Sequence, residues 1–326
     1  MKRALLLYNP ASGQKQHLRL AQVESARSEL ANSGVEAVIE PTWRPGSAGE
    51  QVRDAIVSGF DTILACGGDG TVNEALQGIV GTQAVLGVIP LGTGNALAND
   101  LGISRDPAAA ARLALQSTPR NVAVARIRSQ RRDGGSDERY FLSAAGVGAD
   151  AEMMYRLTLA FKSRRGMLAY YAEAWRQWAT YSYPSFRVEF RGRDCEMRQV
   201  NASQVLAIRI TQFGGLLRRL APGAGLHRPD LQLVIFKSQS RWTYLRFMTG
   251  VILGLPWSTP GVELVSASEL NCLPALPEPQ RIYAEADGEL VGTLPVRIEM
   301  AKEFVRLLVP RVRDDFDSEL QATSLP

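Results

Sequence analysis

The chain has 326 residues, of which 45% are hydrophobic and 21% charged, and its formal net charge is +4. This length allows two domains with a core each, and the modest positive charge favours an anionic ligand or membrane surface without indicating nucleic-acid binding. Three scattered cysteines indicate neither a disulfide framework nor a paired zinc site and favour a reducing cytoplasm, and no apolar run reaches the roughly 18 residues of a membrane span.

Short apolar segments alternate with helical ones through residues 1–122. We predict strands at 4–8, 37–40, 62–65 and 85–89, and helices at 18–32, 49–58, 73–79, 96–101 and 107–116. This alternation predicts an α/β domain with a parallel sheet and helices on both faces. Ligands of such sheets bind beyond the carboxyl ends of the strands.

The most informative stretch is residues 66–74, which read Cys-Gly-Gly-Asp-Gly-Thr-Val-Asn-Glu directly after a predicted strand. Its glycines let phosphate oxygens approach backbone N–H groups, and the start of the next helix adds positive potential. An ordinary strand-to-helix turn has no need of the acid Asp69. The pattern therefore favours a phosphate-binding loop.

Two further turns follow predicted strands in the same way. Residues 9–13, Asn-Pro-Ala-Ser-Gly, carry small polar side chains suited to binding phosphate or to capping the next helix. In residues 90–95, Pro-Leu-Gly-Thr-Gly-Asn, Thr93 and Asn95 could donate to a nucleotide phosphate or ribose. Three such turns at equivalent ends of one sheet indicate a common ligand.

From residue 121 onward most predicted strands are joined without a helix. They lie at 122–127, 140–144, 186–190, 205–210, 231–236, 262–265, 282–286 and 296–300. This pattern predicts a β-rich antiparallel domain, sandwich-like or barrel-like. A last strand at 304–309 could return to the first domain, so we expect an α/β domain of residues 1–122 with 301–326 and a β-rich domain of residues 123–300.

Asp287-Gly288-Glu289 follows the predicted strand 282–286. An Asp-Gly pair between two strands is typical of a hairpin turn. Two acids separated by one glycine would also suit a general base and a metal-linked carboxylate at a phosphoryl-transfer centre. Both interpretations remain open at this point.

The four motifs, at 9–13, 67–71, 90–95 and 287–289, together resemble the diacylglycerol kinase catalytic family in order and spacing. That family includes bacterial lipid kinases and the sphingosine and ceramide kinases, and the resemblance spans essentially the whole chain. Gly-Gly-Asp-Gly alone also occurs in NAD kinases and phosphofructokinases. The resemblance implies a lipid kinase with an ATP-binding α/β domain, a β-rich lipid-binding domain and Mg²⁺-dependent transfer of the γ-phosphate of ATP to a lipid hydroxyl in the intervening cleft.

The resemblance also implies roles for individual residues. Asp287 would accept the hydroxyl proton, Glu289 would orient Mg²⁺ directly or through water, and Asp69 is a second candidate for the base. The residues implied to hold the nucleotide are Asn9, Ser12, Gly13, Thr42, Gly67, Gly68, Gly70, Thr71, Glu74, Gly92, Thr93 and Asn95.

Several positions depart from the family pattern. Ala96 stands where many bacterial members have Asp, and another family Asp is replaced near Ala123. His227 and Arg228 stand where a family turn carries the acids of a structural magnesium site, so we expect that site to be absent. The missing acids leave open a lipid-binding regulatory protein with impaired catalysis. An NAD-type kinase on a related fold is the other alternative.

Apolar and aromatic residues recur at helical spacing in the segments 153–178 and 242–257. Such stripes pack on a sheet or form a lipid-admitting lid at a membrane surface. Asp150 and Glu152 match positions where sphingosine kinases carry acids that meet the lipid head group, although acids are also common at helix starts. We expect a cytoplasmic, peripherally membrane-associated enzyme of lipid metabolism, with a lipid as substrate and no nucleic-acid partner; the acceptor lipid and a homodimer are left open.

Overall fold

The computed structural model describes residues 1–10, 16–130, 135–161, 176, 178–192, 195–214, 220–254, 259–275 and 281–311. The chain forms two units. Unit 1 comprises Met1–Val124, Gln212–Gly215 and Ala301–Pro326, and unit 2 comprises Ala125–Thr211 and Leu216–Met300. Two strands, β5 (Thr118–Gln130) and β14 (Glu289–Val309), each begin in one unit and end in the other.

Unit 1 is built on a parallel sheet. Its strands lie in the order β2 (Glu36–Pro41), β1 (Arg3–Tyr8), β3 (Thr62–Gly67) and β4 (Val85–Pro90), and the end of β14 pairs with β4 in parallel. Both β3 and β4 are buried along their whole length, as strands covered on both faces are. The predicted α/β fold with a parallel sheet is confirmed.

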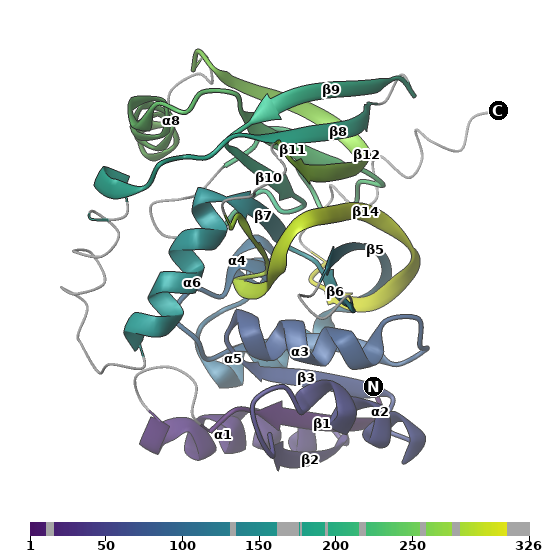
Figure 1. The fold of residues 1–326 in the computed structure, drawn as a ribbon. Coiled ribbons are helices and arrows are strands. Elements are labelled where there is room, and N and C mark those ends of the chain that lie inside the picture. The colour runs from purple at the N-terminus through teal and green to yellow at the C-terminus, as the bar shows by residue number, and fades with distance from the viewer. Residues whose placement is uncertain are drawn as a thin grey trace. The chain divides into compact units, whose positions relative to one another are not determined.

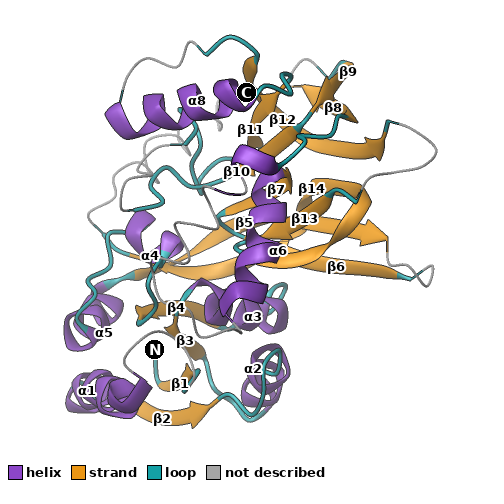
Figure 2. Ribbon diagram, turned by 60° about the vertical axis from the view of Figure 1, so that its left-hand side comes forward, coloured by secondary structure: helices purple, strands orange, loops and turns teal. Residues whose placement is uncertain are grey.

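Helices cover both faces of this sheet (Figure 2). Helices α1 (Arg19–Asn32) and α5 (Pro107–Gln116) pack together on one face, and α2 (Ala48–Val57) and α3 (Asp69–Ile79) on the other. A 3₁₀ turn, η1 (Gln16–Leu18), precedes α1, and the short helix α4 (Ala96–Asp100) follows β4. Helix α3 begins at Asp69 rather than at the predicted residue 73, so that the acid of the glycine loop lies in the first helical turn.

Unit 2 is a mainly antiparallel β-structure (Figure 1). Its strand order is β13 (Tyr283–Ala286), β7 (Ala144–Gly148), β10 (Gln204–Ile208), β11 (Leu231–Phe236), β12 (Val262–Pro274), β8 (Phe186–Gly192) and β9 (Met197–Ala202). The first part of β14 pairs with both β13 and β12, so this run of strands closes on itself. The predicted β-rich second domain is confirmed.

The observed strands differ from the predicted strands in three places. The strand predicted at 140–144 is two strands, β6 (Ser136–Phe141) and β7, because the chain bends at Leu142–Ser143, where both backbone amides bond to Asp287. Strand β9 was not predicted, since its side chains are mostly polar and exposed. The two strands predicted at 296–300 and 304–309 are one continuous strand, β14.

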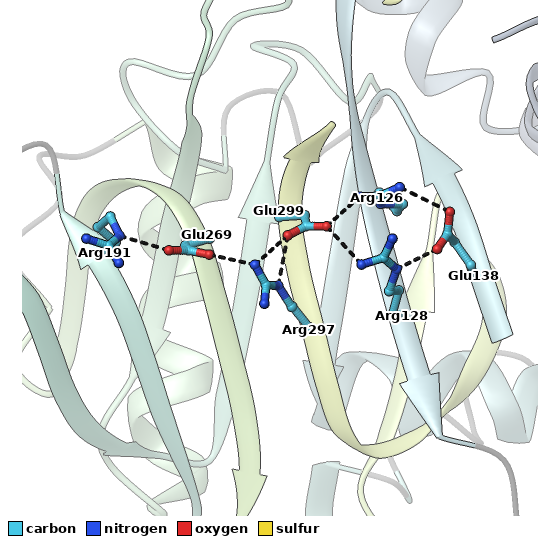
Figure 3. Close-up of polar contacts among 7 residues, drawn as sticks. All are labelled: Arg126, Arg128, Glu138, Arg191, Glu269, Arg297 and Glu299. Atoms are coloured by element: carbon cyan, nitrogen blue, oxygen red, sulfur yellow. Dashed lines mark hydrogen bonds and ion pairs between the residues drawn. The ribbon is translucent and has the colours of Figure 1, made fainter. Parts of the chain in front are cut away.

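A chain of arginines and glutamates links strands β6, β5, β14, β12 and β8 within unit 2 (Figure 3). Glu299 at its centre is 14% exposed and binds Arg126 at 2.7 Å and Arg297 at 2.7 Å. Glu269 joins Arg297 to Arg191 at the far end. Isolated surface pairs add little stability, but a network of this kind favours one strand register over others.

Candidate functional site

The first glycine loop joins the end of β3 to the start of α3. Residue Gly68 is in extended conformation at the helix N-terminus, and its carbonyl accepts the N–H of Val72. A side chain at Gly67 would clash with the buried Thr71, so only glycine fits there. The loop therefore presents backbone rather than side chains, as a phosphate-binding turn requires.

The second loop follows β4 at the same edge of the sheet. Strands β3 and β4 end in register, Gly67 opposite Pro90, and Leu91 donates its N–H to the carbonyl of Gly67 at 2.9 Å. Asn95 is 3% exposed and closes this loop on itself: its Oδ1 accepts from Gly92 N at 3.0 Å and its Nδ2 donates to Gly92 O at 2.8 Å. The Asn95 side chain thus fixes the backbone conformation of the loop.

The two loops touch backbone to backbone. A Cβ built on Gly92 would clash with the Cα of Gly68 and lie 2.8 Å from Oδ1 of Asn95. Glycine at position 92 is therefore a packing requirement, in addition to any role toward a ligand, whereas a Cβ at Gly68 would make a tight contact 3.3 Å from the Cα of Gly92.

Gly92→Ala should destabilise the protein, because the added methyl group must push the loops apart. Overpacking of this kind costs about 1–3 kcal/mol, so we expect a lower midpoint of thermal unfolding. Gly250→Ala is the matched control, since nothing lies within 4 Å of a Cβ at that helical position. An unfolding midpoint for Gly92→Ala equal to that of the wild type would contradict the contact between the loops.

The carboxylate of Asp69 ties the two loops together. Its Oδ2 accepts the N–H of Asn95 at 2.8 Å, and its Oδ1 accepts the N–H of Ala96 at 2.7 Å. These amides lie at the start of α4, where a negative charge is stabilised by the helix N-terminus. Asp69 thus belongs to both loops, which explains why an acid stands among the glycines.

The other described residues predicted to hold the nucleotide lie in several different structural settings. Glu74 caps the start of α2, where it accepts from Gly46 N at 3.0 Å and Ala48 N at 3.3 Å. Thr93 is exposed on the second loop. Asn9 and Thr42 follow β1 and β2, and Thr42 donates its N–H to Tyr8 O at 2.8 Å. Ser12 and Gly13 lie outside the described residues.

The Asp287-Gly288 pair forms the two-residue hairpin turn between β13 and β14. Its φ angles, +49° and +84°, lie in the left-handed region that such turns use. The Asp287 carboxylate reaches the bend between β6 and β7 and accepts from Leu142 N at 3.0 Å, Ser143 N at 2.8 Å and Ala144 N at 3.1 Å. Glu289 follows the turn with an exposed side chain.

The predicted lipid-facing acids are both engaged inside unit 2. Glu152 on α6 (Ala149–Phe161) is 7% exposed and forms an ion pair with Arg156 at 2.6 Å. Asp150 bonds to Glu285 of β13. Sequence reasoning missed Glu285, although an acid among the apolar residues of a strand is a signal that can be recognised.

A second buried group that the sequence did not reveal is Arg209. It is fully buried and donates to Leu226 O at 3.3 Å and Met300 Sδ at 3.3 Å. Burial lowers the pKa of Arg209 to about 10, while the charges of Asp287 and Asp230 act in the opposite direction.

In the segment that departs from the family's metal-binding turn, Arg228 makes a bidentate pair with Asp230 at 2.8 and 2.9 Å.

Comparison with known proteins agrees with these features. The chain matches the model of the diacylglycerol kinase catalytic domain over residues 3–127 and that of the YegS C-terminal NAD kinase beta sandwich-like domain over residues 143–309. The chain belongs to the diacylglycerol kinase family. This is a family of kinases, and its two domain models together span both units.

Relatives in this family cover nearly the full chain. A diacylglycerol kinase of Bacillus subtilis (strain 168) is 27% identical over 317 residues, which are 95% of this chain and 97% of the relative. A diacylglycerol kinase of Staphylococcus aureus (strain MRSA252) is 25% identical over 95% of this chain and 93% of its own.

Solved structures share the fold at lower identity. A diacylglycerol kinase from Bacillus anthracis str. Sterne has a TM-score of 0.68 at 20% identity and covers 95% of this chain and 98% of its own. Yeast NADH kinase complexed with NADH has a TM-score of 0.51 at 11% identity over 100% of this chain and 89% of its own. The fold is thus common to both groups of kinases.

A metal ion would need several ligating side chains close together, or ligands supplied by the substrate. Among the described residues, no group of three or more His, Cys, Asp or Glu side chains is placed to hold a metal. Magnesium at kinase sites is held by one or two carboxylates together with substrate phosphates, so a complete protein cage is not required.

Proposed function

We propose that this protein is an ATP-dependent lipid kinase that transfers the γ-phosphate to a hydroxyl of a lipid. The observation that carries the proposal is the pair of glycine loops at the ends of β3 and β4, locked together by Asp69, in a chain of the diacylglycerol kinase family. ATP is the donor that such a kinase family implies. Curated relatives bear the name diacylglycerol kinase, which supports diacylglycerol as the first acceptor to test.

On the nucleotide side, we propose that residues 67–71 and 92–95 hold the phosphates of ATP. Glycine at positions 67, 68 and 92 keeps side chains away from the loops, which favours approach of phosphate oxygens to the backbone. The positive end of α3 adds to this attraction. Mg²⁺, when bound, would neutralise charge on the phosphates, with Glu289 as its protein ligand.

On the acceptor side, we propose Asp287 as the general base. Three backbone N–H groups fix the orientation of its carboxylate, so the base is held in place before substrate arrives. Asp69 is the rival candidate, and both acids accept backbone N–H groups on both oxygens. We assign a loop-positioning role to Asp69 because its bonds join the two glycine loops, and the proton-accepting role to Asp287 because it matches the family motif at residues 287–289.

The acceptor favoured by these contacts has a neutral head group. A cationic amino-alcohol head would need an acid available for ion pairing. Asp150 is bonded to Glu285 and Glu152 is paired with Arg156, so both predicted acids already have partners within unit 2. We therefore favour diacylglycerol over a sphingoid base.

For membrane contact we propose the exposed face of α8 (Arg241–Leu253). Tyr244, Phe247 and Val251 face the unit 2 core, where Phe236 stacks on Tyr244. The exposed apolar residues of the helix are Trp242 at 65%, Leu245 at 38%, Ile252 at 48% and Leu253 at 62%. Arg241 and Arg246 are its charged residues, and it has no acid, which suits an anionic bilayer surface. Among the described residues, no helix is long and apolar enough to cross a bilayer.

Replacing Ile252 and Leu253 by serine should weaken binding to vesicles that contain phosphatidylglycerol. In the proposed complex these two aliphatic side chains are buried in the bilayer surface. Their loss should lower the vesicle partition coefficient by about tenfold or more. Val57→Ser is the matched control, because Val57 is 89% exposed on α2. Equal partition of the double variant and the wild type in a sedimentation assay would exclude α8 as the membrane face.

The acceptor is tested by offering radiolabelled ATP with diacylglycerol, a sphingoid base, ceramide, phosphatidylglycerol and NAD in parallel. We expect label in diacylglycerol. Label in NAD alone would instead identify an NAD-type kinase, the activity suggested by the shared fold. Lipid binding without transfer to any acceptor would identify a regulatory protein that has lost catalysis.

A further inference from the structure

Two acids lie against each other at the start of α6. Glu285 of β13 is 4% exposed, and its side chain is hydrogen-bonded to that of the partly buried Asp150. Both lie over the bare Cα of Gly146 on β7, which pairs with Glu285 in the sheet. A Cβ built on Gly146 would lie 2.7 Å from Asp150 Oδ2 and 2.9 Å from Glu285 Oε1.

This arrangement requires a proton. An ionised carboxylate only accepts hydrogen bonds, so two carboxyl groups can bond to each other only when one of them is protonated. Glu285 Oε2 already accepts the N–H of Gly288 at 2.8 Å. The proton therefore lies on the side of Glu285 Oε1, toward Asp150.

The surroundings of the pair favour retention of this proton. Burial, followed by the charge of Asp150, raises the pKa of Glu285, and burial raises the pKa of Asp150 to about 6. The charged and titratable groups on the elements around the pair are Glu152, Tyr155 and Arg156 of α6, Tyr283 of β13, Asp287 and Glu289 of the turn, and Arg209 after β10. Strand β7 contributes none, so no nearby cation on that strand replaces the proton.

The pair is connected to the Asp287-Gly288 turn. The turn is held on one side by the Asp287 carboxylate at the β6–β7 bend, and on the other by the bond from Gly288 N to Glu285. The bond between the two acids extends this support to the first turn of α6. Without the shared proton, two negative charges would face each other over Gly146, and repulsion would loosen the support of the turn.

We propose that Asp150 and Glu285 share one proton and thereby position the Asp287-Gly288 turn, with Glu285 as a positioning residue for phosphoryl transfer. The positioning role rests on the proposed kinase function. The shared proton itself does not, because it follows from contacts within unit 2 alone.

Thermal unfolding as a function of pH tests the shared proton without any assay of activity. The pKa of Asp150 in the folded protein is raised from the ordinary 3.8 to about 6, so within this window the folded state holds more protons than the unfolded state. Stability is then greatest at the acid end of the window and falls as the pH rises through it. The shared proton is lost only when the pH rises further, through the higher pKa of Glu285, so we expect the unfolding midpoint of the wild type to fall by about 5 °C more than those of Asp150→Asn and Glu285→Gln between about pH 4 and alkaline pH.

Glu285→Gln and Glu285→Leu test the positioning role. Glutamine can still accept from Gly288 N and can donate to Asp150, but it holds no shared proton. We expect its rate to decline less at alkaline pH than that of the wild type. Leucine loses the bond to Gly288, which should lower kcat by about tenfold, with a smaller loss for glutamine.

The outcomes separate the two claims. If Asp150→Asn and Glu285→Gln both keep the wild-type dependence of the unfolding midpoint on pH, the shared proton is excluded. If Glu285→Leu folds and has the wild-type kcat and pH profile, Glu285 does not position the turn. If the wild type phosphorylates no acceptor, the proposed function fails, while the unfolding measurement still decides whether the proton is shared.

Discussion

Asp287→Asn should lower kcat by about 10²-fold or more, because asparagine cannot accept the hydroxyl proton of the acceptor. The substitution is conservative for the fold. Asparagine tolerates the left-handed conformation that Asp287 adopts at φ +49°, and its amide oxygen can still accept from Ser143 N and Ala144 N, so only the bond from Leu142 N is lost. The comparison therefore separates the chemistry of this side chain from its role in the turn.

Initial rates at saturating ATP and acceptor provide the measurement. Asp54→Asn is the matched control: it removes the same charge from an exposed position on α2 and should leave kcat unchanged. An unchanged kcat in Asp287→Asn would remove Asp287 from the role of base. A lower unfolding midpoint together with a lower kcat would assign the loss to the turn instead.

Asp69→Ala should raise KM for ATP more than it lowers kcat. The substitution leaves the N–H groups of Asn95 and Ala96 without their carboxylate acceptor, so the second glycine loop loses its tie to the first. Hydrogen bonds to a charged group contribute about 1.5–3 kcal/mol each, which corresponds to a rise in KM of at least about tenfold.

Asp69→Asn distinguishes the two candidate bases. Its amide oxygen retains one acceptor for the loop, so we expect a smaller rise in KM than for alanine and a modest change in kcat. A fall in kcat as deep as that of Asp287→Asn, with KM unchanged, would make Asp69 the base. Substrate titrations of both variants beside Asp287→Asn provide this comparison.

Much of the fold follows from local sequence pattern. Strands β1, β3 and β4 of unit 1 are mainly apolar and buried, and α5 coincides with its prediction because Asp106 caps the helix and Pro107 starts it. Strand β9 lacks that apolar signal, and its place in the sheet depends on pairing with β8. The bend between β6 and β7 depends on Asp287, more than 140 residues away, which no local pattern can reveal.

In the candidate site, too, some features follow from local sequence and others from contacts between distant residues. The glycine motifs identify where the loops lie, but the contact between Gly68 and Gly92 and the two bonds of Asp69 become visible only in three dimensions. The shared proton of Asp150 and Glu285 is less predictable still, because it depends on a helix start, a strand and the missing side chain of Gly146. The sequence thus predicts the position of the nucleotide loops better than it predicts the contacts of Asp69, Asp150 and Glu285.

The central claim is phosphoryl transfer from ATP to a lipid hydroxyl, and it is tested most directly by mass spectrometry of diacylglycerol vesicles incubated with ATP, Mg²⁺ and purified protein. We predict accumulation of phosphatidic acid with the wild type and a rate at least about 10²-fold lower with Asp287→Asn. Absence of any phosphorylated lipid with the folded wild-type protein, across the acceptors described above, would contradict the account.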